Sequence, residues 1–397
     1  MPSPQPVLWT RDYIALIFSN LFLFLGLHAL IPTIPAYISF RGGDELAVGL
    51  STTVFAFTAL AVRPFIGRAL DTLGRSKVLL AGLIVLLVSS FGYFFAQTVL
   101  LILLFRLLHG LGFGTTTTAC GTIVSDMVPA ERRGEGMGYY GLSNSFSLAS
   151  APLLGLWVLE QTSFQTLFLT TATLVVFGAL LLQLVRLPAP SASPRSGSAG
   201  SLIGLLEPRA FFPSLLMLFL SVTLGGIISF ITLFGQSVGI TNVGWFFLAN
   251  AAMVALVRPI AGVLFDRKGH AWVLLPGAFF SIAGLLLLSD ATGISSLMIS
   301  ALFYGAGFGA IQPSLHAWTI NRVPAERRGA ANATFLSSID LGIGAGALLL
   351  GIVADVSTYA QMYRWSSLLM VAYLIVYAIY LWNERRNLPA ASTGSVR

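Results

Sequence analysis

Twelve long apolar stretches constrain the fold of this chain more than any other feature. They cover, in two sets of six, residues about 13 to 37, 47 to 70, 77 to 96, 98 to 124, 135 to 159, 164 to 186, 210 to 235, 242 to 265, 271 to 289, 294 to 320, 331 to 354 and 362 to 382. Each is about 20 residues long, enough for an α-helix to cross the roughly 30 Å hydrocarbon core of a bilayer. Because a spanning segment must satisfy its own backbone hydrogen bonds, the sequence predicts an all-α membrane protein with twelve transmembrane helices.

The composition agrees with this class and excludes several others. Of 397 residues, 56% are hydrophobic and only 9% are charged, which is too few to cover the surface of a soluble globule. The net charge of +7 comes from basic residues in short loops, where they set membrane orientation, so we do not expect nucleic-acid binding. The single cysteine, Cys120, excludes an intramolecular disulfide. Without a nucleotide-binding signature or metal-ligand spacing, we expect no enzyme activity, cofactor or metal site.

The chain also repeats itself at an offset of 195 residues. Residues 62–80 return in similar form as 257–275, and the heptapeptide VPAERRG at 128–134 recurs unchanged at 323–329. Landmarks that share one register indicate a duplicated half. We therefore predict two pseudo-symmetric halves of six helices each.

The duplication divides the chain into three parts. We place the N-terminal half at residues 1–186, a linker rich in Pro, Ser and Gly at 187–208, and the C-terminal half with a short tail at 209–397. Most loop arginines and lysines fall on the side of this linker. By the positive-inside rule, the linker and both termini should be cytoplasmic.

A loop motif joins the second and third apolar stretches and reads Gly67-x-x-x-Asp71-x-x-Gly74-Arg75. Gly67 lies one helical turn before Asp71 on the same face, so a partner helix can approach the backbone closely. Asp71 would lie at the membrane surface, where a carboxylate can cap the N-terminus of a neighbouring helix. Gly74 permits the chain to reverse, and Arg75 holds the turn on the cytoplasmic side.

The motif returns in the second half as Gly262, Asp266 and Gly269. Two such copies between apolar stretches resemble the loop signature of the major facilitator superfamily of secondary transporters. The resemblance implies the fold of that superfamily, with two six-helix halves around an axis along the membrane normal and alternating access to a site at the midplane. We expect Asp71 to dock the second span against the eleventh and to stabilise an outward-open state, and the contact of Asp266 to be weaker.

Charged residues within spans are candidate functional residues because they are costly in hydrocarbon. Asp340 is the only acid that we place deep in a span, and Ser145 occupies the equivalent position in the first half. We predict that Asp340 carries a coupling proton or binds substrate; the alternative is a fixed ion pair with a basic residue on another helix. Arg63 and Arg258 are equivalent residues near the cytoplasmic ends of their spans, where we expect them to snorkel to the surface in a structural or gating role.

Arg106 and His109 distinguish the fourth stretch, because the second half has Ala301 and Tyr304 at those positions. The run Arg-x-x-His-Gly resembles the helix-4 signature of proton-coupled members of the superfamily, with histidine in place of the usual glutamine. The resemblance implies a role for Arg106 in proton transfer. Neither Arg106 nor Asp340 has a charged counterpart in the other half, and we expect closure to bring the two together, where the arginine favours the ionised acid. The alternatives are an arginine satisfied by carbonyls and water, and a packed, neutral His109.

Three further features bear on the substrate. His28, in the outer part of the first stretch, either faces a ligand or makes an interhelical hydrogen bond. Tyr304 and other aromatic residues suit an aromatic or amphipathic ligand. Pro152 and Gly155 retain part of the antiporter signature GPxxGG of drug and metabolite exporters, which favours export, although such residues also serve helix packing.

Together these features predict a proton-coupled efflux antiporter of a bacterial inner membrane, a monomer that exports a small organic molecule by alternating access. Its partners would be the substrate, protons and the lipid bilayer. Two other transport functions stay open, namely export of an opine-type metallophore and import of a sugar or other metabolite by symport. A non-transporting membrane sensor on the same scaffold is the alternative from a different class.

Overall fold

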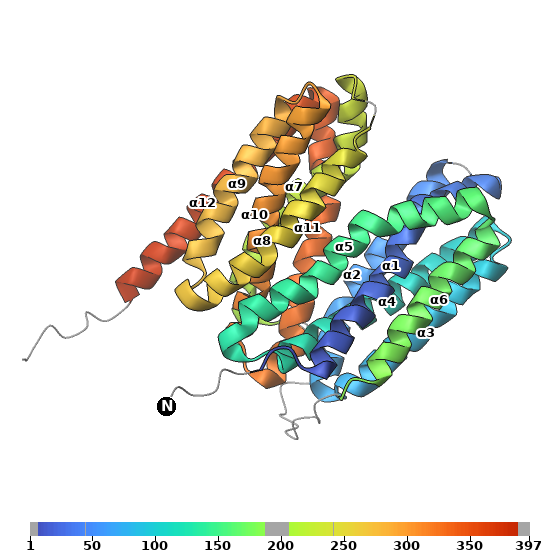
Figure 1. Ribbon diagram of the computed structural model, residues 1–397, viewed down its shortest axis with the longest axis horizontal. Helices are drawn as coiled ribbons and strands as arrows, with labels where there is room; N and C mark the ends of the chain where they lie inside the picture. Colours follow the sequence, from blue (N-terminus) through green and yellow to red (C-terminus); the bar gives the residue numbers. More distant parts are fainter. Residues whose placement is uncertain (1–6, 44, 187–205, 241, 388–397) are drawn as a thin grey trace, which may run out of the picture.

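The computed structural model describes residues 7–43, 45–186, 206–240 and 242–387, and within them twelve helices are long and apolar enough to cross a membrane (Figure 1). The N-terminal half contains α1 (Arg11–Phe40), α2 (Glu45–Thr72), α3 (Arg75–Phe95), α4 (Val99–Met127), α5 (Arg133–Gln161) and α6 (Phe164–Gln183). The C-terminal half contains α7 (Phe211–Ser237), α8 (Gly244–Lys268), α9 (Ala271–Ser289), α10 (Ile294–Asn321), α11 (Arg328–Val356) and α12 (Tyr359–Asn387). The predicted all-α fold with twelve spans is confirmed.

Several helix starts follow directly from local sequence. The hydroxyl oxygens of Thr10, Thr98 and Ser163 accept hydrogen bonds from backbone N–H groups in the first turns of α1, α4 and α6. Such N-caps satisfy donors that have no partner within the helix. Single 3-10 turns precede α5, α7 and α11, namely η1 (Ala130–Arg132), η3 (Pro208–Ala210) and η4 (Ala325–Arg327).

The two halves repeat the same packing. In the first half α1 packs on α5, and α4 packs on α2 and α3; in the second half α7 packs on α11, and α10 packs on α8 and α9. Figure 1 shows the result as two bundles, one formed by α1 to α6 and the other by α7 to α12. The predicted pseudo-symmetric six-helix halves are therefore present in the fold.

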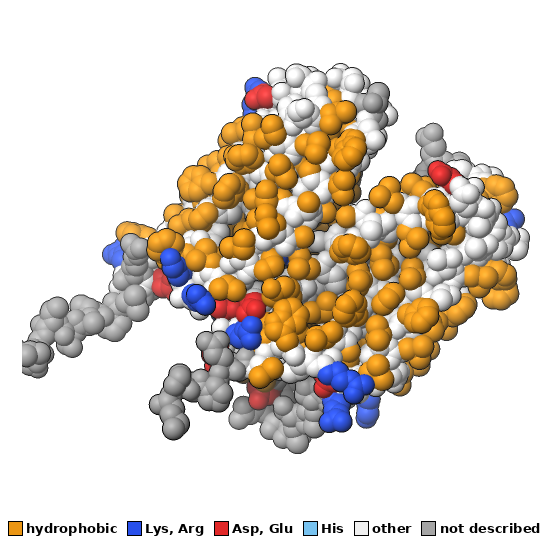
Figure 2. Space-filling model, viewed as in Figure 1, with side chains coloured by type: hydrophobic (Ala, Val, Ile, Leu, Met, Phe, Trp, Pro, Cys, Tyr) orange, Lys and Arg blue, Asp and Glu red, His pale blue; other side chains and the backbone are white. Residues whose placement is uncertain are grey.

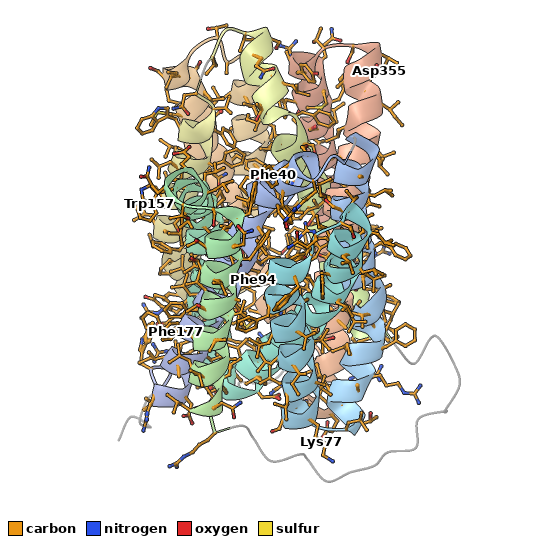
Figure 3. The ribbon with its side chains drawn as sticks, turned by 90° about the vertical axis from the view of Figure 1, so that its right-hand side faces the viewer. Phe40, Lys77, Phe94, Trp157, Phe177 and Asp355 are labelled. Atoms are coloured by element: carbon orange, nitrogen blue, oxygen red, sulfur yellow. The ribbon has the colours of Figure 1, made fainter. Side chains whose placement is uncertain are left out.

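The halves meet mainly along two helix pairs, α2 with α11 and α5 with α8, and less extensively where α10 contacts α5 and α11 contacts α4. Away from these contacts they diverge, and Figure 2 shows the cleft that results between them. Figure 3 places Lys77 and Asp355 at opposite ends of the molecule. We call the end of Lys77, where the halves touch, the closed end, and the end of Asp355, where the cleft widens, the open end.

Large apolar side chains cover the outer surface of both bundles (Figure 2). Among them, Trp157 is 60% exposed and Phe177 is 53% exposed, and both point away from the bundle in Figure 3. A soluble monomer rarely exposes contiguous apolar patches of this extent. The surface is therefore suited to contact with lipid acyl chains.

Residues 187–205 of the expected linker, and residues 388–397 of the tail, lie outside the described residues. The end of the expected linker packs against the C-terminal half. Glu207 is buried, its carboxylate pairs with Arg327 at 2.8 Å, and its backbone N–H donates to Thr334 at 3.1 Å. The chain is thus anchored beside the start of α11 before α7 begins.

Candidate functional site

The first loop motif holds α2 against α11 at the closed end. The Asp71 carboxylate accepts hydrogen bonds from the backbone N–H groups of Gly329 and Ala330, both at 2.9 Å, in the first turn of α11. One turn earlier, a Cβ atom on Gly67 would lie only 2.6 Å from the Cβ of Ala333. Glycine is therefore required for this close approach, and the carboxylate caps the positive end of the α11 dipole. The contact is the one expected from the sequence, while its role in gating stays a prediction.

The second motif makes the equivalent contact between α8 and α5. The Asp266 carboxylate accepts hydrogen bonds from the backbone N–H groups of Gly134 at 2.7 Å and Glu135 at 2.9 Å. A Cβ atom on Gly262 would lie 2.6 Å from the Gly134 carbonyl oxygen. These hydrogen bonds are as short as those of Asp71, so they give no support to the expectation of a weaker contact.

The turns after the two aspartates share a backbone conformation but differ in charge. Gly74 has φ 93° and Gly269 has φ 83°, a region that favours glycine. Arg75 follows the first glycine, whereas His270 follows the second and stacks on Trp318 with ring centroids 4.2 Å apart. Burial lowers the pKa of His270 and so favours its neutral form. The fixed positive charges of the second turn, Arg267 and Lys268, therefore lie before the glycine, whereas Arg75 of the first turn lies after it.

A network of charged groups surrounds the first turn. Arg75 pairs with Asp71 at 3.3 Å and with Asp126 of α4 at 3.1 Å, and Asp126 also pairs with Arg328 of α11 at 2.9 Å. Asp126 and Arg328 were missed by reasoning from the sequence. The repeated heptapeptide was the available signal, because Asp126 lies two residues before its first copy and Arg328 lies within its second copy.

An ion pair joins the halves inside the membrane-spanning region. Nε of Arg63, on α2, donates to Oδ2 of Asp340, on α11, at 2.7 Å, and Nη1 of Arg63 donates to the hydroxyls of Thr117 and Thr118 on α4 at 3.0 and 3.1 Å. The Arg63 side chain is 3% exposed, so the expectation that it snorkels to the surface is wrong; acceptors inside the protein satisfy it instead. The geometry matches the alternative given for Asp340, an ion pair with a basic residue on another helix, and in this conformation its partner is Arg63 rather than the expected Arg106.

Arg106 and His109 lie within the N-terminal half. Arg106 is 4% exposed, its Nε donates to the carbonyl oxygen of Ser51 at 3.2 Å, and its guanidinium lies over the ring of Phe55 at 4.8 Å from the centroid. This contact matches the alternative of an arginine satisfied by a backbone carbonyl, while a role of Arg106 in proton transfer stays a prediction. His109 is 1% exposed, and its Nδ1 forms a hydrogen bond of 3.1 Å with the hydroxyl of Tyr93. This geometry matches the packed alternative for His109.

Two other candidates make interhelical hydrogen bonds. Nδ1 of His28 lies 3.0 Å from the hydroxyl of Ser147 on α5, and the hydroxyl of Tyr304 lies 2.9 Å from that of Thr223 on α7. Tyr304 is only 1% exposed, so its ring packs inside the C-terminal half. In this conformation both residues serve helix packing, and a role of either in binding substrate stays a prediction.

The antiporter-like residues lie where α5 crosses α1. A Cβ atom on Gly155 would lie 2.5 Å from the carbonyl oxygen of Ala29, so this glycine allows the two helices to approach closely. Pro152 lies within α5, about one turn earlier. Helix packing explains the glycine without reference to the direction of transport.

Two helical bundles that are closed at one end by paired helix caps, and crossed by an internal ion pair, define a multi-pass membrane protein of the transporter type. The sequence profile of the Major Facilitator Superfamily matches residues 16–267 and 214–395. The chain belongs to this superfamily.

Relatives of similar sequence match most of the chain. An uncharacterized MFS-type transporter of Methanocaldococcus jannaschii is 24% identical over 370 residues, covering 91% of this chain and 95% of that protein. The quinolone resistance protein NorA of Staphylococcus aureus is 25% identical over 368 residues, covering 88% of this chain and 92% of NorA.

Solved structures of the superfamily have the same fold. The human organic anion transporter MFSD10 superposes with a TM-score of 0.75 at 18% identity, covering 94% of this chain and 100% of that one. The transporter FucP in its outward conformation superposes with a TM-score of 0.73 at 18% identity, covering 93% of this chain and 99% of that one. At such identities the similarity shows the fold alone.

Proposed function

We propose that this transporter exports small, drug-like organic molecules in exchange for protons by alternating access to the cleft between its halves. The observation that carries the proposal is the Arg63–Asp340 ion pair, because it links the two moving halves through a group that can take up a proton. Similarity to the quinolone resistance protein NorA and the partial antiporter motif at Pro152 also support it. The protein would lie in a bacterial inner membrane with the closed end cytoplasmic, and the present conformation would be outward-open.

The ion pair suggests how proton uptake is linked to opening. Asp340 is 26% exposed, so water in the cleft can reach it, whereas Arg63 is buried. The Coulomb attraction between two unit charges about 4 Å apart near a protein surface is about 4 kcal/mol before the cost of desolvating them is subtracted, so loss of one charge shifts a two-state equilibrium. A proton on Asp340 removes this attraction, so α2 and α11 can separate and the cleft can turn to the other side. The hydroxyls of Thr117 and Thr118 continue to accept hydrogen bonds from Nη1 of Arg63 meanwhile.

Reconstituted vesicles test this function directly. The purified chain is placed in proteoliposomes with a pH gradient, and the internal pH and the uptake of norfloxacin or ethidium are followed by fluorescence. We expect substrate to accumulate against its gradient while protons leave by exchange, and both signals to stop when an ionophore removes the gradient. Protein-free liposomes control for passive movement of weak bases. If no tested substrate accumulates or moves protons beyond that control, the antiport proposal fails.

Loss of one helix cap should shift the conformational equilibrium. Asp71→Asn places an amide N–H₂ where a carboxylate oxygen now accepts from α11, so about 1 to 2 kcal/mol of stabilisation of the closed end is lost. We expect about a 5- to 30-fold shift toward the conformation that is open at this end. Spin labels at Lys77→Cys and Lys268→Cys, in a background with Cys120→Ala, would report it as a longer distance.

The exposed acid at the open end provides the matched control for this shift, because Asp355→Asn changes the net charge equally without touching the cap. Asp266→Asn should lengthen the same distance, since its carboxylate makes the same pair of hydrogen bonds. A label distance in Asp71→Asn equal to that in Asp355→Asn would contradict a gating role for the loop motif.

A further inference from the structure

The C-terminal half has an arginine at the position equivalent to Arg63, the residue that pairs with Asp340. Arg258 on α8 is the equivalent of Arg63 on α2, and each is 3% exposed. Their surroundings differ in the number of hydrogen-bond acceptors. The positions equivalent to the three acceptors of Arg63, namely Asp340, Thr117 and Thr118, are occupied by Ser145, Gln312 and Pro313. Ser145 thus stands where the carboxylate of Asp340 would be, and Pro313 has no side-chain acceptor in place of the Thr118 hydroxyl.

The contacts of Arg258 reflect this difference. Its Nη2 donates to Oε1 of Gln312 on α10 at 2.6 Å. Its Nε and Nη1 are buried and have no hydrogen-bond partner among the described residues. Nη1 lies directly against Gly141 of α5, where any Cβ atom would collide with it. Ser145 lies one turn further along α5. The guanidinium therefore lies at the interface between the halves with two of its donor nitrogens unused.

A buried cation without an anion is costly. An unpaired charge in the membrane interior costs several kcal/mol, and a guanidinium can donate two parallel hydrogen bonds to one carboxylate. We propose that Arg258 is a substrate-binding residue that receives the carboxylate of an organic anion, in the position that Asp340 occupies beside Arg63. This inference rests on the proposed export function and specifies its substrate class. Arg63 and Asp340 then serve proton movement, and Arg258 serves recognition.

The location of Arg258 suits loading from the closed end. It lies about two turns along α8 from Asp266, whose carboxylate caps α5 at that end. In the present conformation α5 and α8 seal the guanidinium. When these helices separate, Nε and Nη1 become accessible to the compartment that the closed end faces. An exporter loads its substrate from that compartment, so Arg258 would meet the substrate there. Arg63 is not a candidate for the same role, because Asp340 already supplies its carboxylate.

Binding measurements with paired ligands test the inference. Norfloxacin carries a carboxylate, its ethyl ester lacks the charge, and ethidium is a cation without any acid group. Affinity for the purified full-length chain in lipid nanodiscs is measured for each ligand. A charge-assisted hydrogen-bonded pair contributes about 1.5 to 3 kcal/mol, so norfloxacin should bind the wild type about 10- to 150-fold more tightly than its ester.

Two variants remove this preference by different routes. Arg258→Gln deletes the cation, and Ser145→Asp supplies an internal carboxylate that pairs with Arg258 and excludes the ligand. In both, the ratio of ester to acid dissociation constants should fall to about 1, while ethidium affinity stays at the wild-type value. Ser145→Asp retains the arginine, so it tests the site even where Arg258→Gln folds poorly. Arg68→Gln is the matched control, because it removes a cation of α2 outside this site.

The outcomes separate the inference from the proposed function. An acid preference absent from the wild type, or unchanged in both variants, overturns the carboxylate site. If the preference is present and is lost in the variants, but vesicles show no proton-driven export, the anion site stands and the antiport proposal fails. If export proceeds without any acid preference, the antiport proposal stands and Arg258 is a packing residue.

Discussion

Asp340→Asn is expected to abolish transport driven by a pH gradient while leaving substrate binding measurable. The amide cannot gain or lose a proton, so the interaction between α2 and α11 no longer changes with protonation. Its carbonyl oxygen can still accept a hydrogen bond from Arg63, and Thr117 and Thr118 remain as further acceptors, so the fold should be retained. Uptake into proteoliposomes with and without a pH gradient measures the first effect, and ligand binding in nanodiscs measures the second.

Asp355→Asn is the control for this variant. It removes the same charge, but at a residue that is exposed at the open end. It should transport like the wild type. Transport by Asp340→Asn with undiminished dependence on the pH gradient would show that another group carries the proton. The Arg63–Asp340 pair would then have only a structural role.

Gly67→Ala is expected to open the closed end more strongly than loss of a single helix cap. The added Cβ would lie 2.6 Å from Ala333 Cβ and 2.8 Å from the Gly329 carbonyl oxygen, so α2 and α11 must move apart. Overpacking of this kind costs about 1 to 3 kcal/mol, which shifts a two-state equilibrium about 5- to 150-fold. The spin-label distance across the closed end should increase, and transport should fall because the present conformation is less often populated during the cycle.

The matched substitution is Gly344→Ala on α11, because a Cβ atom there meets nothing within 4 Å. Both variants add one methyl group to a membrane-spanning helix, but only the first lies between the halves. Equal label distances in the two variants would contradict the view that close approach at Gly67 holds the closed end together.

Much of the architecture could be predicted from sequence because it depends on local or repeated features. Length and hydropathy identify each span, and the 195-residue repeat places the spans in two sets. The loop contacts were also predictable. The glycine lets a partner helix approach closely, and the aspartate one turn later places an anion where it can cap the N-terminus of that helix. Gly67 and Asp71 meet α11 in this way.

The pairing of charges inside the bundle could not be predicted in the same manner. Arg63 and Asp340 are 277 residues apart, and nothing local to either residue identifies the other. The position of Arg63 near the end of its helix suggested that its side chain extends to the membrane surface. Instead, a carboxylate and two hydroxyls on neighbouring helices accept its hydrogen bonds inside the protein. Arg106 was expected to meet Asp340 on closure, but in this conformation it donates to the Ser51 carbonyl of a neighbouring helix.

The sequence by itself therefore determined the membrane-spanning class, the twelve helices, the duplication and the superfamily, since hydropathy and glycine spacing act within single segments. The tertiary structure alone decided which charged groups meet. Helical periodicity places a residue on a face and at a depth, whereas its partner depends on which helix packs against that face and in which register. For this reason the three acceptors around Arg63, and the incomplete set around Arg258, became apparent only when both halves were assembled.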